Sequence, residues 1–132
     1  MPAPRRTVTF RVKFNDGRFA EDLERCRPEG RRVARQARVQ LERDGAPQDL
    51  LTSCAGEHRD GTDLPGMVKL YVPMPYGPWG LVLQGATDDA GLHLLAVAFG
   101  ERHADRRPTV YDIAHHRQHG TWPYGMRSHP ST

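Results

Sequence analysis

Side chains that can bind phosphate and move protons gather in the last third of this 132-residue chain. Arg102 and His103 stand side by side, and Tyr111 and His115 follow shortly after. A planar guanidinium can hold two phosphate oxygens at once, and an imidazole exchanges protons near neutral pH. The pattern indicates a site for a phosphate-containing ligand. The structural alternative is a solvated basic turn followed by a helix whose tyrosine packs in the core.

The segment Val110–His119 is predicted to be a short helix. Thr109 is suited to cap its first turn, and Asp112 completes a capping-box pattern three residues later. Gly120 is a typical residue to end a helix. These end signals are local, so the helix bounds follow from the sequence directly.

On this helix Tyr111, His115 and His119 would share one face, because they are four residues apart. The spacing of the two histidines also suits zinc. However, the chain has no carboxylate or cysteine at a matching spacing, so we expect proton transfer rather than a metal site. No phosphate-cradling glycine motif follows a strand either, which argues against a nucleotide cofactor.

The strands that must position these residues show alternating apolar side chains. Thr7–Phe14 alternates as a first strand, and Met67–Val72 resumes the pattern with Lys69 and Tyr71 on the face opposite its apolar residues. Turn signals separate two further strands, Trp79–Gln84 and Leu92–Phe99, and together with Met67–Val72 they predict a three-stranded antiparallel meander. Because Leu92–Phe99 is apolar on both faces, it is expected at the centre of the sheet.

Between the first strand and the meander, two helices are expected as an αα-hairpin. One covers about Phe19–Cys26, and Pro28 separates it from a longer one over Glu29–Asp44 that Gly45 ends. The longer helix has an apolar stripe and a basic remainder, which is typical of a solvated face and also compatible with binding nucleic acid.

These elements predict a single α+β domain over residues 1–117, followed by a flexible tail over residues 118–132. No apolar run is long enough to span a membrane, so a cytoplasmic protein is expected. The net charge is only +3, but 17 of the 19 basic residues are arginine, so the charge permits a nucleic-acid partner. Cys26 and Cys54 are expected to be free thiols.

Three segments resemble the RelE/ParE superfamily of toxins from toxin–antitoxin systems. Leu64–Val72, "LPGMVKLYV", is similar to its second-strand motif L-x-G-x-x-E-L-R-V. Leu94–His103 resembles the last strand running into a basic turn, and Arg107–Arg117, "RPTVYDIAHHR", resembles the family's C-terminal ending. The predicted order of elements, with strand, helix pair, meander and short C-terminal helix, is that of the family, and the proline in the ending favours the HigB/RelE-like branch.

The resemblance implies a ribosome-dependent mRNA endonuclease that cleaves through attack of a 2′-hydroxyl on the adjacent phosphate without a metal. It also implies an antitoxin protein as partner. The expected catalytic residues are Lys69, Arg102, His103, Tyr111 and His115. The expected RNA-binding residues are Tyr71, Arg106, Arg107 and Arg117. His58, in the polar loop before the second strand, is a further candidate.

One departure from the family keeps other functions open. RelE-type nucleases usually carry an arginine on the third strand, whereas this chain has Gly80 in the sequence Trp79-Gly80-Leu81-Val82-Leu83. The alternatives are a ParE-like inhibitor that binds DNA gyrase without cleaving anything, and an inactive, phage-derived relative that has kept only the fold.

Overall fold

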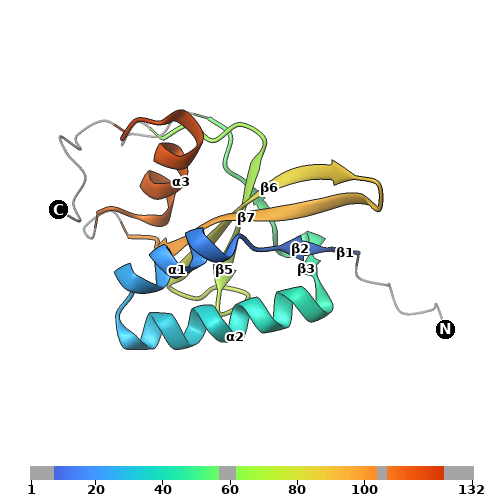
Figure 1. The fold of residues 1–132 in the computed structure, drawn as a ribbon, viewed down its shortest axis with the longest axis horizontal. Helices are drawn as coiled ribbons and strands as arrows, with labels where there is room; N and C mark the ends of the chain where they lie inside the picture. Colours follow the sequence, from blue (N-terminus) through green and yellow to red (C-terminus); the bar gives the residue numbers. More distant parts are fainter. Residues whose placement is uncertain (1–7, 57–61, 104–106, 124–132) are drawn as a thin grey trace.

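The structure is a computed structural model that describes residues 8–56, 62–103 and 107–123, and it has a mixed α+β fold (Figure 1). The helices of the described chain are α1 (Asp16–Arg25), α2 (Pro28–Asp44) and α3 (Val110–His119), with a 3-10 turn at Gln48–Leu50. The strands are β1 (Thr9–Phe10), β2 (Val12–Lys13), β3 (Ala46–Pro47), β4 (Thr52–Ser53), β5 (Met67–Val72), β6 (Trp79–Asp88) and β7 (Gly91–Glu101). None of these described helices is long and apolar enough to cross a membrane.

The main sheet has five strands in the order β2-β7-β6-β5-β4, and all neighbours are antiparallel except β2 and β7. This order differs from the predicted three-stranded meander, because short strands add to both sides of β5, β6 and β7. The centre of the sheet is therefore β6 and not the segment Leu92–Phe99. The added strands β2 and β4 have two residues each. β2 is part of the predicted N-terminal strand and β4 was not predicted, and the partner with which each pairs is set by long-range contacts that leave no periodic signal in the sequence.

The N-terminal strand predicted over Thr7–Phe14 is divided into two, and Thr7 itself lies outside the described residues. β1 pairs with β3 in a separate two-stranded sheet, whereas β2 joins the main sheet beside β7. The break falls at Arg11, whose carbonyl accepts a hydrogen bond from the Leu94 N–H at 2.8 Å. Continuous alternation thus concealed a change of partner in the middle of the segment.

Helix ends follow their local signals closely. α2 begins at Pro28 and ends before Gly45, which has a φ of 80°. α3 has its predicted bounds, with a complete capping box between Thr109 and Asp112. α1 begins at Asp16, earlier than predicted, because the Asn15 side chain accepts a hydrogen bond from the Arg18 N–H and so caps the first turn.

The two long faces of the sheet are covered by different helices, with α2 on one side and α3 on the other (Figure 1). On the α2 side Leu41 packs with Leu70 and Leu81, and on the α3 side Val82 packs with Val110. Alternation along β5 sends Leu70 toward α2 and its neighbours toward α3. The α3 face is therefore the one on which the predicted site residues of β5 lie.

The end of the described chain packs back against α3. The Trp122 ring stacks on the His116 ring with centroids 4.3 Å apart and planes 19° apart, and Pro123 is buried. The boundary expected at residue 118 falls inside α3, and the rest of the predicted tail, residues 124–132, lies outside the described residues.

Asp88 ties the N-terminal strand to the hairpin of β6 and β7. Its carboxylate accepts a hydrogen bond from Lys13 Nζ at 2.7 Å, and Arg11 Nη2 and His93 Nδ1 lie 3.5 and 3.6 Å from it. The hydrogen bond from Lys13, followed by one from the Ala90 N–H, lowers the pKa of Asp88 to about 2.

We expect Asp88→Asn to flatten the acid limb of the stability curve. A carboxyl whose folded pKa is about 2 and ordinary pKa is 3.8 contributes stability that is fully present above pH 3.8 and is lost as the pH falls through 2. Thermal unfolding at a series of pH values over this interval measures the difference. The neighbouring exposed carboxylate supplies the control, Asp89→Asn, which should leave the slope as in the wild type. Identical slopes for Asp88→Asn and the wild type would contradict the assignment.

Candidate functional site

Four of the predicted site residues meet on the α3 face of the sheet. Lys69 and Tyr71 come from β5, Arg102 follows β7 directly, and Tyr111 lies in the first turn of α3. The Arg102 Cζ lies 3.8 Å from the centre of the Tyr71 ring, and Lys69 Nζ lies 5.7 Å from the Tyr71 ring and 5.3 Å from the Tyr111 ring. All four side chains are partly exposed. We call them the basic–aromatic cluster.

The fold brings these residues together for reasons that are visible in the strands. Residues 69 and 71 point to the same side of β5 because alternate residues share a face. Val110 is fully buried in the core between α3 and the sheet, so the next residue, Tyr111, lies beside Gly80 of β6 and the Lys69 side chain. Arg102 continues the run of β7 beyond the last pair of the ladder, Trp79 with Glu101.

The two positive charges of the cluster, Arg102 and Lys69, are held by neutral groups within the described chain. Arg102 Nη1 donates to the Gly77 carbonyl at 2.7 Å, and its guanidinium is near enough to the Tyr111 hydroxyl to act on the pKa of that phenol. In the part of the chain that the structure describes, no carboxylate forms a salt bridge with Arg102 or Lys69. Two cations held by neutral partners favour binding of an anion such as phosphate.

The Tyr111 phenol keeps its proton at neutral pH. Burial raises the pKa of Tyr111 to about 12, and the positive charge of Arg102 opposes only part of that rise. Cys54 lies behind the cluster as a buried thiol, and burial raises its pKa to about 11 in spite of the nearby Lys69. Tyr111 is thus a hydrogen-bond donor rather than a base, and Cys54 is not a thiolate nucleophile.

The histidines of α3 make other contacts. His115 Nδ1 lies 3.0 Å from the Thr121 carbonyl, and His119 Nε2 lies 3.0 Å from the Asp63 carbonyl, with the two rings 4.4 Å apart. They connect the end of α3 to adjacent loops and are not part of the basic–aromatic cluster. His103 is exposed and directly follows Arg102, at the margin of the cluster.

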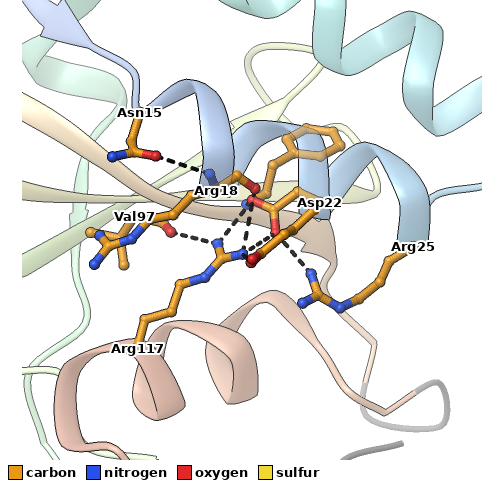
Figure 2. A network of polar contacts seen from close by, with 8 residues as sticks. Asn15, Arg18, Asp22, Arg25, Val97 and Arg117 are labelled. Atoms are coloured by element: carbon orange, nitrogen blue, oxygen red, sulfur yellow. Dashed lines mark hydrogen bonds and ion pairs between the residues drawn. The ribbon is translucent and has the colours of Figure 1, made fainter. Parts of the chain in front are cut away.

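Two arginines that were predicted to bind RNA are occupied within the fold. Arg107 forms a bidentate pair with Asp112, with distances of 3.0 and 2.8 Å, and so reinforces the capping box of α3. Arg117 lies with its side chain only 8% exposed, in the network of Figure 2. Arg106 and His58 lie outside the described residues.

The network around Arg117 was not predicted. Arg117 pairs with Asp22 at 2.9 and 3.1 Å, Asp22 accepts from the Phe99 N–H at 2.9 Å, and Arg117 donates to the Val97 carbonyl at 2.7 Å (Figure 2). Asp22 and Arg117 therefore hydrogen-bond the backbone of β7 just past the residues that pair with β2. The two side chains take the place that a neighbouring strand would have there. One feature of the sequence could have indicated that Asp22 is buried: it lies within the apolar stripe of α1, between Phe19 and Leu23.

The described chain offers no group of three or more His, Cys, Asp or Glu side chains arranged to hold a metal ion. No protein-family model, no curated protein and no solved structure matches the chain. The resemblance to RelE/ParE toxins consequently remains a prediction from motifs, and function has to be argued from the basic–aromatic cluster.

Proposed function

We propose that this chain is the toxin of a toxin–antitoxin pair, with a RelE/ParE-like arrangement, and that it cleaves mRNA on the ribosome. The observation that carries the proposal is the meeting of Lys69, Arg102, Tyr71 and Tyr111 on one face of the sheet. Cations that contact phosphate and flat groups that stack on bases are what recognition of single-stranded RNA requires.

In the proposed reaction the 2′-oxygen forms a bond to phosphorus and the bond from phosphorus to the 5′-oxygen breaks. Arg102 and Lys69 stabilise the negative charge that builds on the phosphate oxygens. Tyr111, protonated at neutral pH, gives its proton to the departing 5′-oxygen. His103, exposed beside Arg102, accepts the proton of the 2′-hydroxyl.

The base-stacking role predicted for Tyr71 has to be shared with Arg102. The Arg102 guanidinium lies over one face of the Tyr71 ring, at 3.8 Å, so a base cannot use that face while Arg102 stays there. A guanidinium is itself a flat surface on which bases stack. In the proposal a base stacks on the outer face of Arg102, and Tyr71 supports the arginine from below.

A second candidate is a ParE-like inhibitor that binds DNA gyrase and cleaves nothing. Two observations favour it. Gly80 stands where RelE-type nucleases usually have an arginine, and the Tyr111 phenol is not a base. Either toxin would be held inactive by an antitoxin, which should be acidic where it covers the two cations of the cluster.

Inducible expression followed by mapping of transcript 5′ ends tests the proposal. We expect new ends within translated mRNAs, together with arrest of growth. Arrest accompanied by DNA breaks and intact transcripts would overturn the nuclease and support the gyrase inhibitor. Normal growth with intact transcripts would overturn both and leave the inactive relative.

A further inference from the structure

The path of the Arg102 side chain depends on a glycine in the neighbouring strand. To lie over Tyr71 on β5, Arg102 has to cross β6, and it does so at Gly80, which pairs with Tyr71. A Cβ atom added to Gly80 would lie 3.2 Å from Arg102 Cγ, 3.0 Å from Val110 Cγ1 and 3.8 Å from the Tyr111 hydroxyl. Three parts of the site therefore converge on the space that a side chain at residue 80 would fill.

A second glycine continues this gap across the sheet. Gly80 pairs with Gly100 of β7, and Val110 packs over Gly100, where an added Cβ would meet its nearest atoms at 3.7 Å. The two glycines leave a flat strip on which the first turn of α3 lies close to the sheet. This approach brings Tyr111 within reach of Arg102, since Tyr111 follows Val110.

A third glycine fixes the far end of Arg102. The Gly77 carbonyl accepts the 2.7 Å hydrogen bond from Arg102, and the Gly77 N–H donates to the Pro73 carbonyl at 2.8 Å. A Cβ added to Gly77 would lie 2.1 Å from backbone atoms of Val72 and Pro73. Since backbone cannot move aside as a flexible side chain can, only glycine fits this turn.

We infer that Gly80 is a positioning residue of the basic–aromatic cluster: its missing side chain lets Arg102 cross β6, where Gly77 holds its guanidinium over Tyr71. Arg102, the cation that would face a ligand, thus comes from the end of β7, although β6 lies between β7 and the strand of its aromatic partner, Tyr71. Gly80 touches no ligand and acts only through Arg102 and Tyr111.

Gly80→Ala tests this role against Gly85→Ala, a matched control in the same strand where an added Cβ meets nothing within 4 Å. Neither position has a left-handed backbone, so the substitutions differ only in what surrounds the new methyl group. In nuclear magnetic resonance spectra the Arg102 side-chain signals should be shifted by the Tyr71 ring current in the wild type and in Gly85→Ala. We expect this shift to be lost in Gly80→Ala. Its retention there would overturn the inference.

A folding defect must be separated from the loss of Arg102 placement, because the new methyl group also meets Val110. The double variant Gly80→Ala/Val110→Ala removes that contact and leaves the one with Arg102 Cγ. With Val110→Ala alone as reference, we expect a native-like spectrum in which only the Arg102 shift is missing. If the double variant regains the shift, Gly80 is needed only to make room for Val110 of α3 and not for Arg102, and the inference is wrong.

Of these measurements, only the binding of a single-stranded RNA oligonucleotide depends on the proposed function being correct. Loss of one charge-assisted contact should weaken binding by about tenfold in Gly80→Ala and leave it unchanged in Gly85→Ala. If no variant and not even the wild type binds RNA, the proposed function fails, while the loss of the Arg102 shift still supports the positioning role. If RNA binding in Gly80→Ala equals that of Gly85→Ala, the inference fails even though the proposed function stands.

Discussion

Arg102→Ala is expected to lower the rate of RNA cleavage by about 10²- to 10³-fold, the usual cost of removing one group that stabilises charge in a transition state. The truncation removes the cation that lies over Tyr71 and whose charge acts on the Tyr111 hydroxyl. In cells the same change should relieve growth arrest. Cleavage of a defined transcript by purified protein, with ribosomes present, measures the effect.

A matched control separates the loss of this arginine from the loss of a positive charge. Arg35 is exposed on α2, on the opposite side of the sheet, so Arg35→Ala changes the net charge equally without touching the cluster. Arg102 makes only partly exposed contacts, and its removal should cost about 1 kcal/mol or less in the free energy of unfolding. Cleavage at the wild-type rate by a folded Arg102→Ala protein would rule out the proposed role.

The core of this site could be predicted because each member carries a local signal. Alternation along Met67–Val72 put Lys69 and Tyr71 on one face, and the end of an apolar strand put Arg102 at the sheet margin. The capping pattern set the start of α3 and therefore the place of Tyr111. The pattern could not predict how close these side chains come to one another. In our inference that closeness depends on Gly80 and Gly77, which act through Arg102, a residue distant from them in the chain.

The same limit explains what the sequence concealed elsewhere. Arg117 matches a charged position near a helix end, and such positions are ordinarily solvated. Its buried partner Asp22 lies 95 residues earlier in the chain, so no local pattern joins them. The short strands β3 and β4 are missed for a similar reason, and so is the division of the N-terminal strand into β1 and β2. Their bounds are set by the partner strands rather than by their own two residues.

Breaking the buried pair of Asp22 and Arg117 should have the largest effect on stability in the molecule. Asp22 is 3% exposed, and it bonds Arg117, Arg25 and the Phe99 N–H at once (Figure 2). Removing one partner leaves a buried charge with only a more exposed counter-charge, Arg25 for Asp22 or Glu21 for Arg117. Asp22→Ala or Arg117→Met should therefore lower the free energy of unfolding by about 3 kcal/mol. Urea denaturation at neutral pH measures this. Glu21→Ala, which removes only the exposed partner of Arg117, should cost at most about 1 kcal/mol.

The double variant Asp22→Leu/Arg117→Met shows what the pair contributes beyond its charge. Replacing both members of a buried ion pair by apolar residues is often neutral in other proteins. Here the pair also satisfies the Phe99 N–H and the Val97 carbonyl at the edge of β7, and each would lose its partner at a cost of about 1–3 kcal/mol. We therefore expect the double variant to stay at least about 2 kcal/mol less stable than the wild type. Full recovery would mean that the edge finds other partners.

The pH dependence of this pair should have the opposite sign to that of Asp88. Burial raises the pKa of Asp22 above its ordinary 3.8, although Arg117 opposes the rise. Between 3.8 and the raised value the native state holds more protons than the unfolded state, so the contribution of Asp22 to the free energy of unfolding falls as the pH rises through that interval. Asp22→Asn removes the titration and should remove the contribution of Asp22 to this slope, whereas Asp88→Asn should flatten the loss of stability at lower pH. Two carboxylates that both bond cations are thus distinguished by burial alone.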